Sequence, residues 1–184
     1  AQLLQVQDAP TRYDLSSLRL CLSAGESLPP EILRRWQARF GLEICDVIGS
    51  TDALYVFIGN RPGQVRIGST GTVIPGFEAK IVDEQGQEVG PDTVGSLLVR
   101  GESTAPLYWN KHRKSQQTML GDWLHTGDQF RCDAEGYYWY AGRADDMLKV
   151  GGIWVSPVEV ENVLMEHEAV LETAVVGAED KDAL

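Results

Sequence analysis

Glycine and proline punctuate the sequence from Gly59 onward, and this spacing limits most of the chain to short elements. Both residues destabilise helix interiors, and clusters of them mark turns. Between these turns, residues 77–82 alternate apolar and polar side chains as a half-buried strand does, and residues 96–99 are also strand-like. We therefore predict a small, mostly antiparallel, barrel-like β region over residues 59–144, interrupted by one polar helix at about residues 111–119.

The first third of the chain has a different pattern, in which strands and a helix alternate. Residues 18–24 are an apolar run suited to a buried strand, and residues 42–48 are predicted to form a second strand. The helix between them ends at Gly41 and has one apolar face. That face carries Ile32, Leu33, Trp36 and Phe40. Residues 1–58 are therefore predicted to be an α/β unit of the kind that belongs to a larger sheet.

The pattern changes again at residue 145, where a charged turn leads into two short strands. Residues 147–150 and 153–155 are joined by adjacent glycines, which favours a β-hairpin. We expect a small α+β domain to begin here and to be unfinished at residue 184. Because the chain begins with Ala1 instead of methionine, we expect it to be a piece cut from a longer protein.

A helix is predicted directly after this hairpin. Ser156 suits the N-cap, Pro157 suits the first helical position, and Glu159 is placed to close a capping box. The helix should run to about residue 166 and bury three apolar side chains, which are Val160, Val163 and Leu164. Residues 170–176 are predicted to form the next strand.

The charge and composition exclude several classes of protein. With 16 basic and 27 acidic residues the chain has a formal net charge of −11, which argues against binding to nucleic acid or to an anionic membrane. The absence of a long apolar run or an apparent signal peptide predicts a cytoplasmic protein. The cysteines and histidines lack the spacing of a disulfide framework or a zinc site. They are Cys21, Cys45, Cys132, His112, His125 and His167.

Three polar segments contain residues suited to binding or catalysis. The turn from Gly49 to Asp52 offers N–H groups, a hydroxyl and a carboxylate that suit a phosphate and its Mg²⁺, although an ordinary Asx turn has the same composition. Asp128, next to a glycine, could accept hydrogen bonds from ribose hydroxyls. The stretch 142–152 concentrates an arginine, two carboxylates and a lysine, and the simpler interpretation is a solvated linker with an Arg–Asp pair.

Taken together and in order, the motifs make the chain resemble the adenylate-forming superfamily of acyl-CoA synthetases, adenylation domains and luciferases. The motifs are Ser23-Ala24-Gly25-Glu26, Ile48-Gly49-Ser50-Thr51-Asp52, Gly95-Ser96-Leu97-Leu98-Val99-Arg100-Gly101 with Tyr108-Trp109-Asn110, His125-Thr126-Gly127-Asp128, and the segment from Gly142 to Glu161. The resemblance covers nearly the whole chain. Residues 145–157 look most like the benzoate–CoA ligase family.

This resemblance implies a fold, an activity and a set of ligands. Residues 1–144 would be the C-terminal part of a large AMP-binding domain, and residues 145–184 would be the hinge and the beginning of the small domain. The parent enzyme would join an aromatic, benzoate-like carboxylate to ATP, with Mg²⁺ as cofactor, and pass the acyl group from acyl-AMP to coenzyme A. A homodimer of the parent is left open. The phosphate-binding loop would precede Ala1 and the catalytic lysine would follow Leu184, so we expect the chain alone to be inactive.

The resemblance also assigns roles to individual residues. In the adenylation half, the adenine would be bordered by Ala24, Gly25, Glu26 and Asp46. Thr51 would contact the phosphate, and Asp52 would be the magnesium-associated acid. Asp128 would hold the ribose hydroxyls, and Arg143 would contact ribose or phosphate. Beyond these, Asp145 would be the hinge residue, and Gly151 and Gly152 would border the pantetheine arm. Lys149 would either act in the thioester step or be an ordinary surface lysine, and Ile48 and Tyr55 would lie at the acyl pocket.

Departures from the family pattern leave alternatives open. Asp52 stands where glutamate is usual, Val47 stands where a small glycine is usual, Ile48 replaces an aromatic residue, and Tyr55 replaces a histidine. One alternative is an adenylation domain that loads a carrier protein. Another is a degenerate nucleotide-binding module without catalytic activity. The basic run 111–114 could steer the CoA nucleotide or be a solvated helix face.

Overall fold

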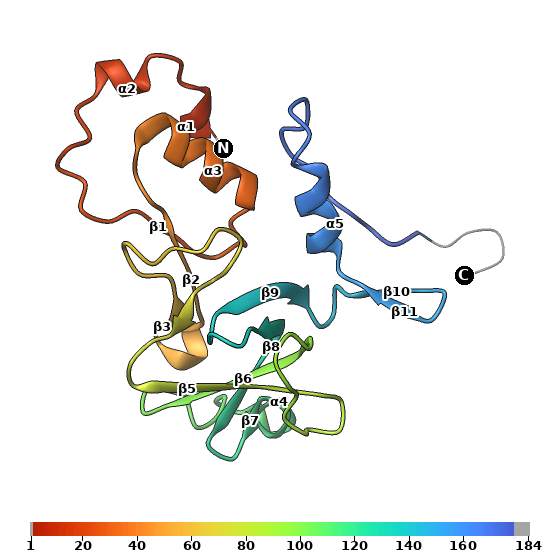
Figure 1. Cartoon of the computed structure of the whole chain (residues 1–184). Coiled ribbons are helices and arrows are strands. Elements are labelled where there is room, and N and C mark those ends of the chain that lie inside the picture. Colours follow the sequence, from red (N-terminus) through yellow and green to blue (C-terminus); the bar gives the residue numbers. More distant parts are fainter. Residues whose placement is uncertain (1, 179–184) are drawn as a thin grey trace.

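In the computed structural model, which describes residues 2–178, short helices flank two β-sheets and a separate hairpin (Figure 1). The helices are α1 (Gln2–Gln5), α2 (Ala9–Arg12), α3 (Pro30–Phe40), α4 (His112–Thr118) and α5 (Pro157–Leu164), and η1 (Thr51–Ala53) is a 3₁₀ turn. The strands are β1 (Leu22–Ser23), β2 (Cys45–Gly49), β3 (Val56–Gly59), β4 (Thr72–Val73), β5 (Phe77–Val82), β6 (Gly95–Gly101), β7 (Met119–Leu120), β8 (Trp123–Cys132), β9 (Tyr138–Arg143), β10 (Leu148–Val150) and β11 (Ile153–Val155).

The first sheet contains the predicted α/β unit. Its strand order is β1-β2-β3-β4, with β1 parallel to β2 and the other pairs antiparallel. Helix α3 connects β1 to β2 and ends at Gly41, as the sequence predicts. Strand β3 was not predicted, although its run of apolar residues is a strand signal.

The prediction of a buried strand over residues 18–24 is wrong in extent and in burial. Only Leu22–Ser23 pairs with β2, and the side chains of Leu18, Leu20 and Leu22 are exposed. A strand requires a continuous ladder of partners, and β1 pairs on one side only within the part of the chain that the structure describes. The apolar run therefore lies at an uncovered edge of this sheet.

The second sheet confirms the mostly antiparallel β region. It has the order β5-β6-β8-β7, and β9 pairs with the far half of β8. The strand pairs are antiparallel, and register shifts in β6 and β8 curl the sheet. Helix α4 packs beside β7 and β8, which confirms the expected polar helix (Figure 1).

A single apolar core joins the two sheets. Phe57 and Ile58 from β3 pack in one buried cluster with Leu97 from β6 and with Phe130 from β8. At the edge of this core, the N–H of Tyr138 in β9 donates to the carbonyl of Gly71, 2.8 Å away. Because the sheets share a core, the polar residues of β2, β8 and β9 are held in a fixed relation to one another.

The hairpin and the last helix follow β9 along the chain. Strands β10 and β11 pair antiparallel, which confirms the predicted hairpin, and Gly151 and Gly152 both have positive φ angles, as a two-residue turn of this kind requires. The Ser156 hydroxyl oxygen accepts from the Glu159 N–H at 3.1 Å, which confirms the predicted N-cap of α5. The same hydroxyl donates to the carbonyl of Ala141 at 2.6 Å and ties α5 to β9.

Two expectations for this end of the chain are wrong. The side chains of Val160, Val163 and Leu164 are exposed, because no element within residues 2–178 covers that face of α5. No strand forms at residues 170–176, which find no partner ladder within the same residues. Over the described range, no helix has both the length and the apolar character needed to cross a membrane.

Candidate nucleotide-binding site

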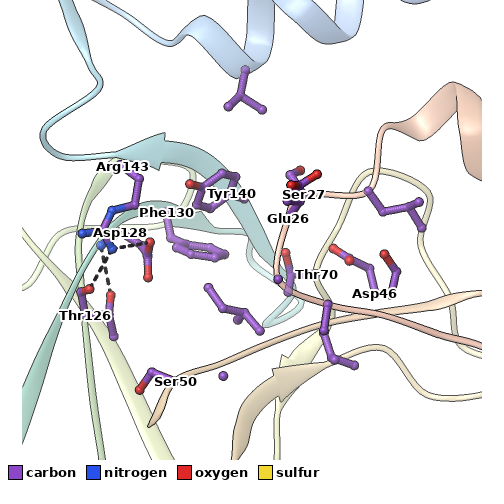
Figure 2. A pocket seen from close by; sticks show the side chains of 18 of the residues that line it. Glu26, Ser27, Asp46, Ser50, Thr70, Thr126, Asp128, Phe130, Tyr140 and Arg143 are labelled. Atoms are coloured by element: carbon purple, nitrogen blue, oxygen red, sulfur yellow. Dashed lines mark hydrogen bonds and ion pairs between the residues drawn. The ribbon is translucent and has the colours of Figure 1, made fainter. Parts of the chain in front are cut away.

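A large cavity of about 1560 Å³ lies where the two sheets and α5 face one another. Figure 2 shows Asp128, Phe130, Tyr140 and Arg143 on one side of it and Glu26, Ser27, Asp46 and Thr70 on the other. The first group belongs to β8 and β9, whereas Glu26 and Ser27 lie in the turn after β1 and Asp46 lies in β2. The far wall is formed by α5 and the segment after it, through Val158, Glu161, Asn162, Met165, Leu171, Glu172 and Thr173.

Asp128 and Arg143 form the best-defined polar pair in this cavity. They lie opposite each other in the β8–β9 ladder, and the Arg143 Nη1 donates to Asp128 Oδ1 at 3.1 Å. The same nitrogen donates to the carbonyl of Thr126, also at 3.1 Å, and these bonds are drawn in Figure 2. Burial raises the pKa of Asp128 above its usual range, although the Arg143 charge opposes the increase.

Arg143 also contacts the charged turn that follows β9. Its Nε donates to Asp145 Oδ1 at 3.3 Å, so that one guanidinium bridges two carboxylates. The Arg–Asp pair that the sequence allowed as a simple linker contact is therefore present. It exists together with the pairing to Asp128, since the planar guanidinium can donate along two edges at once.

Asp46 is a buried carboxyl without a partner at one oxygen. Its side chain is 9% exposed, and Oδ1 makes no hydrogen bond within residues 2–178. Burial raises the pKa of this group to about 7, because the ionised form loses its hydration and no cation replaces it. A carboxyl with this pKa is about half protonated near pH 7, and its protonated form can donate a hydrogen bond.

The loop after β2 carries the Thr51 and Asp52 side chains. Ser50 caps the 3₁₀ turn η1, its hydroxyl oxygen accepting from the Ala53 N–H at 3.2 Å. The Tyr108 hydroxyl donates to Asp52 Oδ2 at 2.9 Å, and the Asp52 carbonyl accepts from the Ala105 N–H at 2.7 Å. The segment between β6 and α4 therefore holds Asp52 at the rim of the cavity.

Many residues selected from the sequence line this one cavity. They are Ala24, Gly25, Glu26, Asp46, Ile48, Thr51, Asp52, Asp128 and Arg143. The other selected residues do not line it, and they are Tyr55, Asp145, Lys149, Gly151 and Gly152. Of these, Tyr55 is exposed, and the Lys149 ammonium lies 5.3 Å from the centre of the Trp154 ring across the hairpin.

Several residues that line the cavity were not assigned to the nucleotide site from the sequence. Tyr108 belongs to a motif that was recognised, but its bond to Asp52 spans 56 positions and has no local signal. Thr70, Tyr140 and Lys114 also line the cavity. Lys114 lies in the basic run 111–114, which the sequence indicated as a possible contact for the CoA nucleotide and not as part of this cavity.

The residues around Asp52 fit a magnesium ion that arrives with a nucleotide. Mg²⁺ commonly takes one or two carboxylates and completes its shell with substrate phosphates and water. Asp52 supplies one carboxylate, and Thr51 beside it supplies a hydroxyl. Within residues 2–178 there is no cluster of three or more acidic, histidine or cysteine side chains that could hold a metal by itself.

The chain belongs to the AMP-binding enzyme family, whose sequence profile matches residues 1–109. It is 51% identical to the benzoate–CoA ligase of Thauera aromatica, and the match covers all of this chain and 35% of that enzyme. It is 47% identical to the 4-hydroxybenzoate–CoA/benzoate–CoA ligase of Rhodopseudomonas palustris, over 91% of this chain and 31% of that enzyme. The chain thus spans about a third of the length of these relatives.

The chain also superposes on solved structures of aromatic acid–CoA ligases. The anthranilate–CoA ligase AuaEII, in complex with anthranoyl-AMP, superposes with a TM-score of 0.92 at 51% identity over 98% of this chain and 35% of that one. A benzoate–CoA ligase from Burkholderia xenovorans LB400 superposes with a TM-score of 0.83 at 51% identity over 89% of this chain and 33% of that one. The architecture is therefore part of an adenylate-forming enzyme fold, mixed α/β with a curled sheet.

Proposed function

We propose that this chain is part of an ATP-dependent acid–thiol ligase that activates a benzoate-like carboxylate as acyl-AMP and transfers it to coenzyme A. The observation that carries the proposal is the shared cavity of the Asp128–Arg143 pair and the Ser50–Asp52 loop. The similarity to aromatic acid–CoA ligases supports the substrate class. Residues 1–144 then belong to the large AMP-binding domain, and residues 145–184 to the hinge and small domain.

The proposed chemistry has two steps. A carboxylate oxygen of the acid attacks the α-phosphorus of ATP, and the bond to the pyrophosphate oxygen breaks. The thiolate of CoA then attacks the acyl carbonyl carbon, and the bond to the AMP oxygen breaks as AMP leaves. Since both nucleophile and phosphate are anionic, alignment and charge neutralisation are the main tasks of the protein.

The residues of this chain would serve the nucleotide. The buried Asp128 carboxylate would accept hydrogen bonds from the ribose hydroxyls, with Arg143 holding its orientation. Ala24, Gly25, Glu26 and Asp46 would border the adenine, and Thr51 would contact the phosphate. Bound Mg²⁺, held by Asp52, would reduce the negative charge of the phosphates.

The second step would use the region after β9. Asp145 would be the hinge residue about which the small domain turns, and its bond to Arg143 would break during that rotation. Gly151 and Gly152 would border the pantetheine arm, and Lys149 would act in the thioester step. The acyl pocket would include Ile48 and Tyr55. Adjacent glycines suit that role because backbone without side chains allows close approach.

Asp128→Asn in the complete ligase tests this proposal. We expect the apparent KM for ATP in pyrophosphate exchange to rise by about tenfold, because the amide cannot accept from both hydroxyls as a carboxylate does. Asp92→Asn is the matched control, since Asp92 also pairs with an arginine of the same sheet, Arg131, but outside the cavity. Unchanged ATP dependence in Asp128→Asn would contradict the ribose role.

Substrate class is tested with wild-type enzyme. Benzoate, 4-hydroxybenzoate and anthranilate should support exchange at lower concentrations than acetate or hexanoate. A preference for the aliphatic acids would contradict the aromatic assignment, and no exchange with any acid would contradict the ligase function. Thioester formation with free CoA, rather than with the phosphopantetheine of a carrier protein, separates the CoA ligase from the carrier-loading alternative.

One observation favours a second candidate, a nucleotide-binding module that has lost catalysis. Asp52 is one methylene shorter than the usual glutamate, and Tyr108 already occupies one of its oxygens. If Asp52→Glu creates exchange activity where the wild type has none, the degenerate module is correct. Exchange activity in the wild type excludes it.

A further inference from the structure

The cavity lining has more acidic side chains than lysine and arginine side chains to pair with them. Its lining includes six carboxyl groups, on Glu26, Asp46, Asp52, Asp128, Glu161 and Glu172. Within residues 2–178, the lysine and arginine side chains that line it are Arg143 and Lys114. Arg143 is already committed to Asp128 and Asp145, whereas Lys114 forms no ion pair with any residue in the described part of the chain.

Lys114 lies on the same rim of the cavity as the Thr51–Asp52 turn. Its ammonium is 4.8 Å from the centre of the Tyr108 ring, and the hydroxyl of that ring donates to Asp52 Oδ2. The next residue, Ser115, accepts from the Tyr108 N–H through its hydroxyl oxygen at 2.8 Å. Tyr108 is therefore held from two sides, and its ring faces a lysine that is otherwise free to bind an anion.

We propose that Lys114 binds the phosphate chain of ATP and the pyrophosphate that leaves it, at the rim that Tyr108 and Asp52 define. The inference rests on the proposed ligase function and adds to it a phosphate-binding residue on α4. A triphosphate placed among six carboxyl groups would be repelled except where a cation faces it. Lys114 and a magnesium ion at Asp52 would supply positive charge on the same rim, so the phosphate chain is oriented toward α4 and away from α5.

The geometry separates Lys114 from its basic neighbours. Lys111, His112 and Arg113 belong to the same exposed run but do not line the cavity. Arg113 is adjacent on α4 and carries the same charge, so it reports the general electrostatic effect of removing one cation. Lys114→Arg preserves the charge at the rim and reports whether charge is what the site requires.

The test compares ATP, pyrophosphate and AMP in the complete ligase. In Lys114→Ala we expect the apparent KM for ATP and for pyrophosphate in the exchange reaction to rise by about tenfold, the size of one charge-assisted hydrogen bond. The affinity for AMP, measured by calorimetric titration, should stay within about twofold, since AMP lacks the phosphates in question. Lys114→Arg should recover most of the loss, and Arg113→Ala should behave as wild type.

Several outcomes would overturn the inference. ATP and pyrophosphate dependence close to wild type in Lys114→Ala would show that the lysine does not touch the phosphates. Equal weakening of AMP would show a general disturbance of the site. A change confined to the KM for CoA would assign Lys114 to the thiol substrate. Failure of the wild type itself to bind ATP would refute the proposed function as well, whereas the other outcomes leave that function intact.

Discussion

At the scale of single residues, burial has changed the chemistry of Asp46 more than its sequence context suggests. The side chain is inside the protein, one oxygen lacks a partner within residues 2–178, and the pKa rises to about 7. In the unfolded chain the same carboxyl has an ordinary pKa near 3.8. The folded state therefore binds the proton more tightly than the unfolded state does.

This difference predicts how stability depends on pH. The contribution of Asp46 is most favourable below about pH 4, decreases between about pH 4 and 7 as the unfolded state loses its proton first, and is constant at higher pH. Asp46→Asn should remove this decrease and be more stable than wild type at about pH 8, by up to about 4 kcal/mol. Urea unfolding at about pH 5 and about pH 8 measures the effect.

Asp122→Asn is a suitable control for that experiment, because Asp122 lies in an exposed turn. Its stability should follow that of wild type at both pH values to within about 0.5 kcal/mol. If Asp46→Asn also followed wild type at both pH values, Asp46 would be ionised in the folded protein. It would then need a cation or a hydrogen-bond donor at its unpartnered oxygen.

At the scale of elements, the junction of the two sheets depends on close contact between the backbone of Gly71 and the backbone at the end of β3. Its φ angle is +106°, and a Cβ there would overlap the backbone of Gly59 and Asn60 at the end of β3. Its carbonyl also accepts from Tyr138 in β9. The junction between the sheets thus requires a residue without a side chain.

Gly71→Ala should therefore destabilise the protein by about 3 kcal/mol or more, since both the φ angle and the overlap oppose it. Gly76→Ala is the matched control, because Gly76 has a φ of +95° but a Cβ there meets nothing within 4 Å. That variant should lose only about 1 kcal/mol, from the φ angle alone. Equal losses in chemical unfolding would show that the close approach at Gly71 does not matter.

Elements also differ in how well local sequence predicted them. The β10–β11 hairpin and the N-cap of α5 were predicted correctly, because adjacent glycines and a serine before proline act within a few residues. The strand expected at residues 170–176 and the buried face expected for α5 were predicted wrongly. Both depend on partner elements that a pattern of apolar residues cannot supply.

At the scale of the whole molecule, the cavity is assembled from distant parts of the chain. The turn after β1, the loop after β2, strands β8 and β9, and α5 all contribute side chains. Known relatives are about three times as long as this chain. We propose that the 184 residues supply part of the nucleotide site and that the complete ligase supplies the remainder.

The chain by itself should therefore form no acyl-adenylate. Pyrophosphate exchange with benzoate-like acids should be undetectable for the isolated 184 residues and clear for the complete ligase. The physical reason is that a phosphate chain with several negative charges needs more cationic and N–H groups than this cavity provides. Turnover by the isolated chain would contradict this expectation and would show that the site is already complete.

The sequence by itself determined the element types with strong local signals and, through motifs in a fixed order, the enzyme family. Only the tertiary structure decided that Asp46 is buried without a partner, that Tyr108 holds Asp52, and that Lys114 faces the cavity unpaired. The physical reason is the distance along the chain over which each kind of interaction acts. Turns and caps depend on neighbours a few residues away, whereas burial and charge pairing depend on which segments the fold brings together.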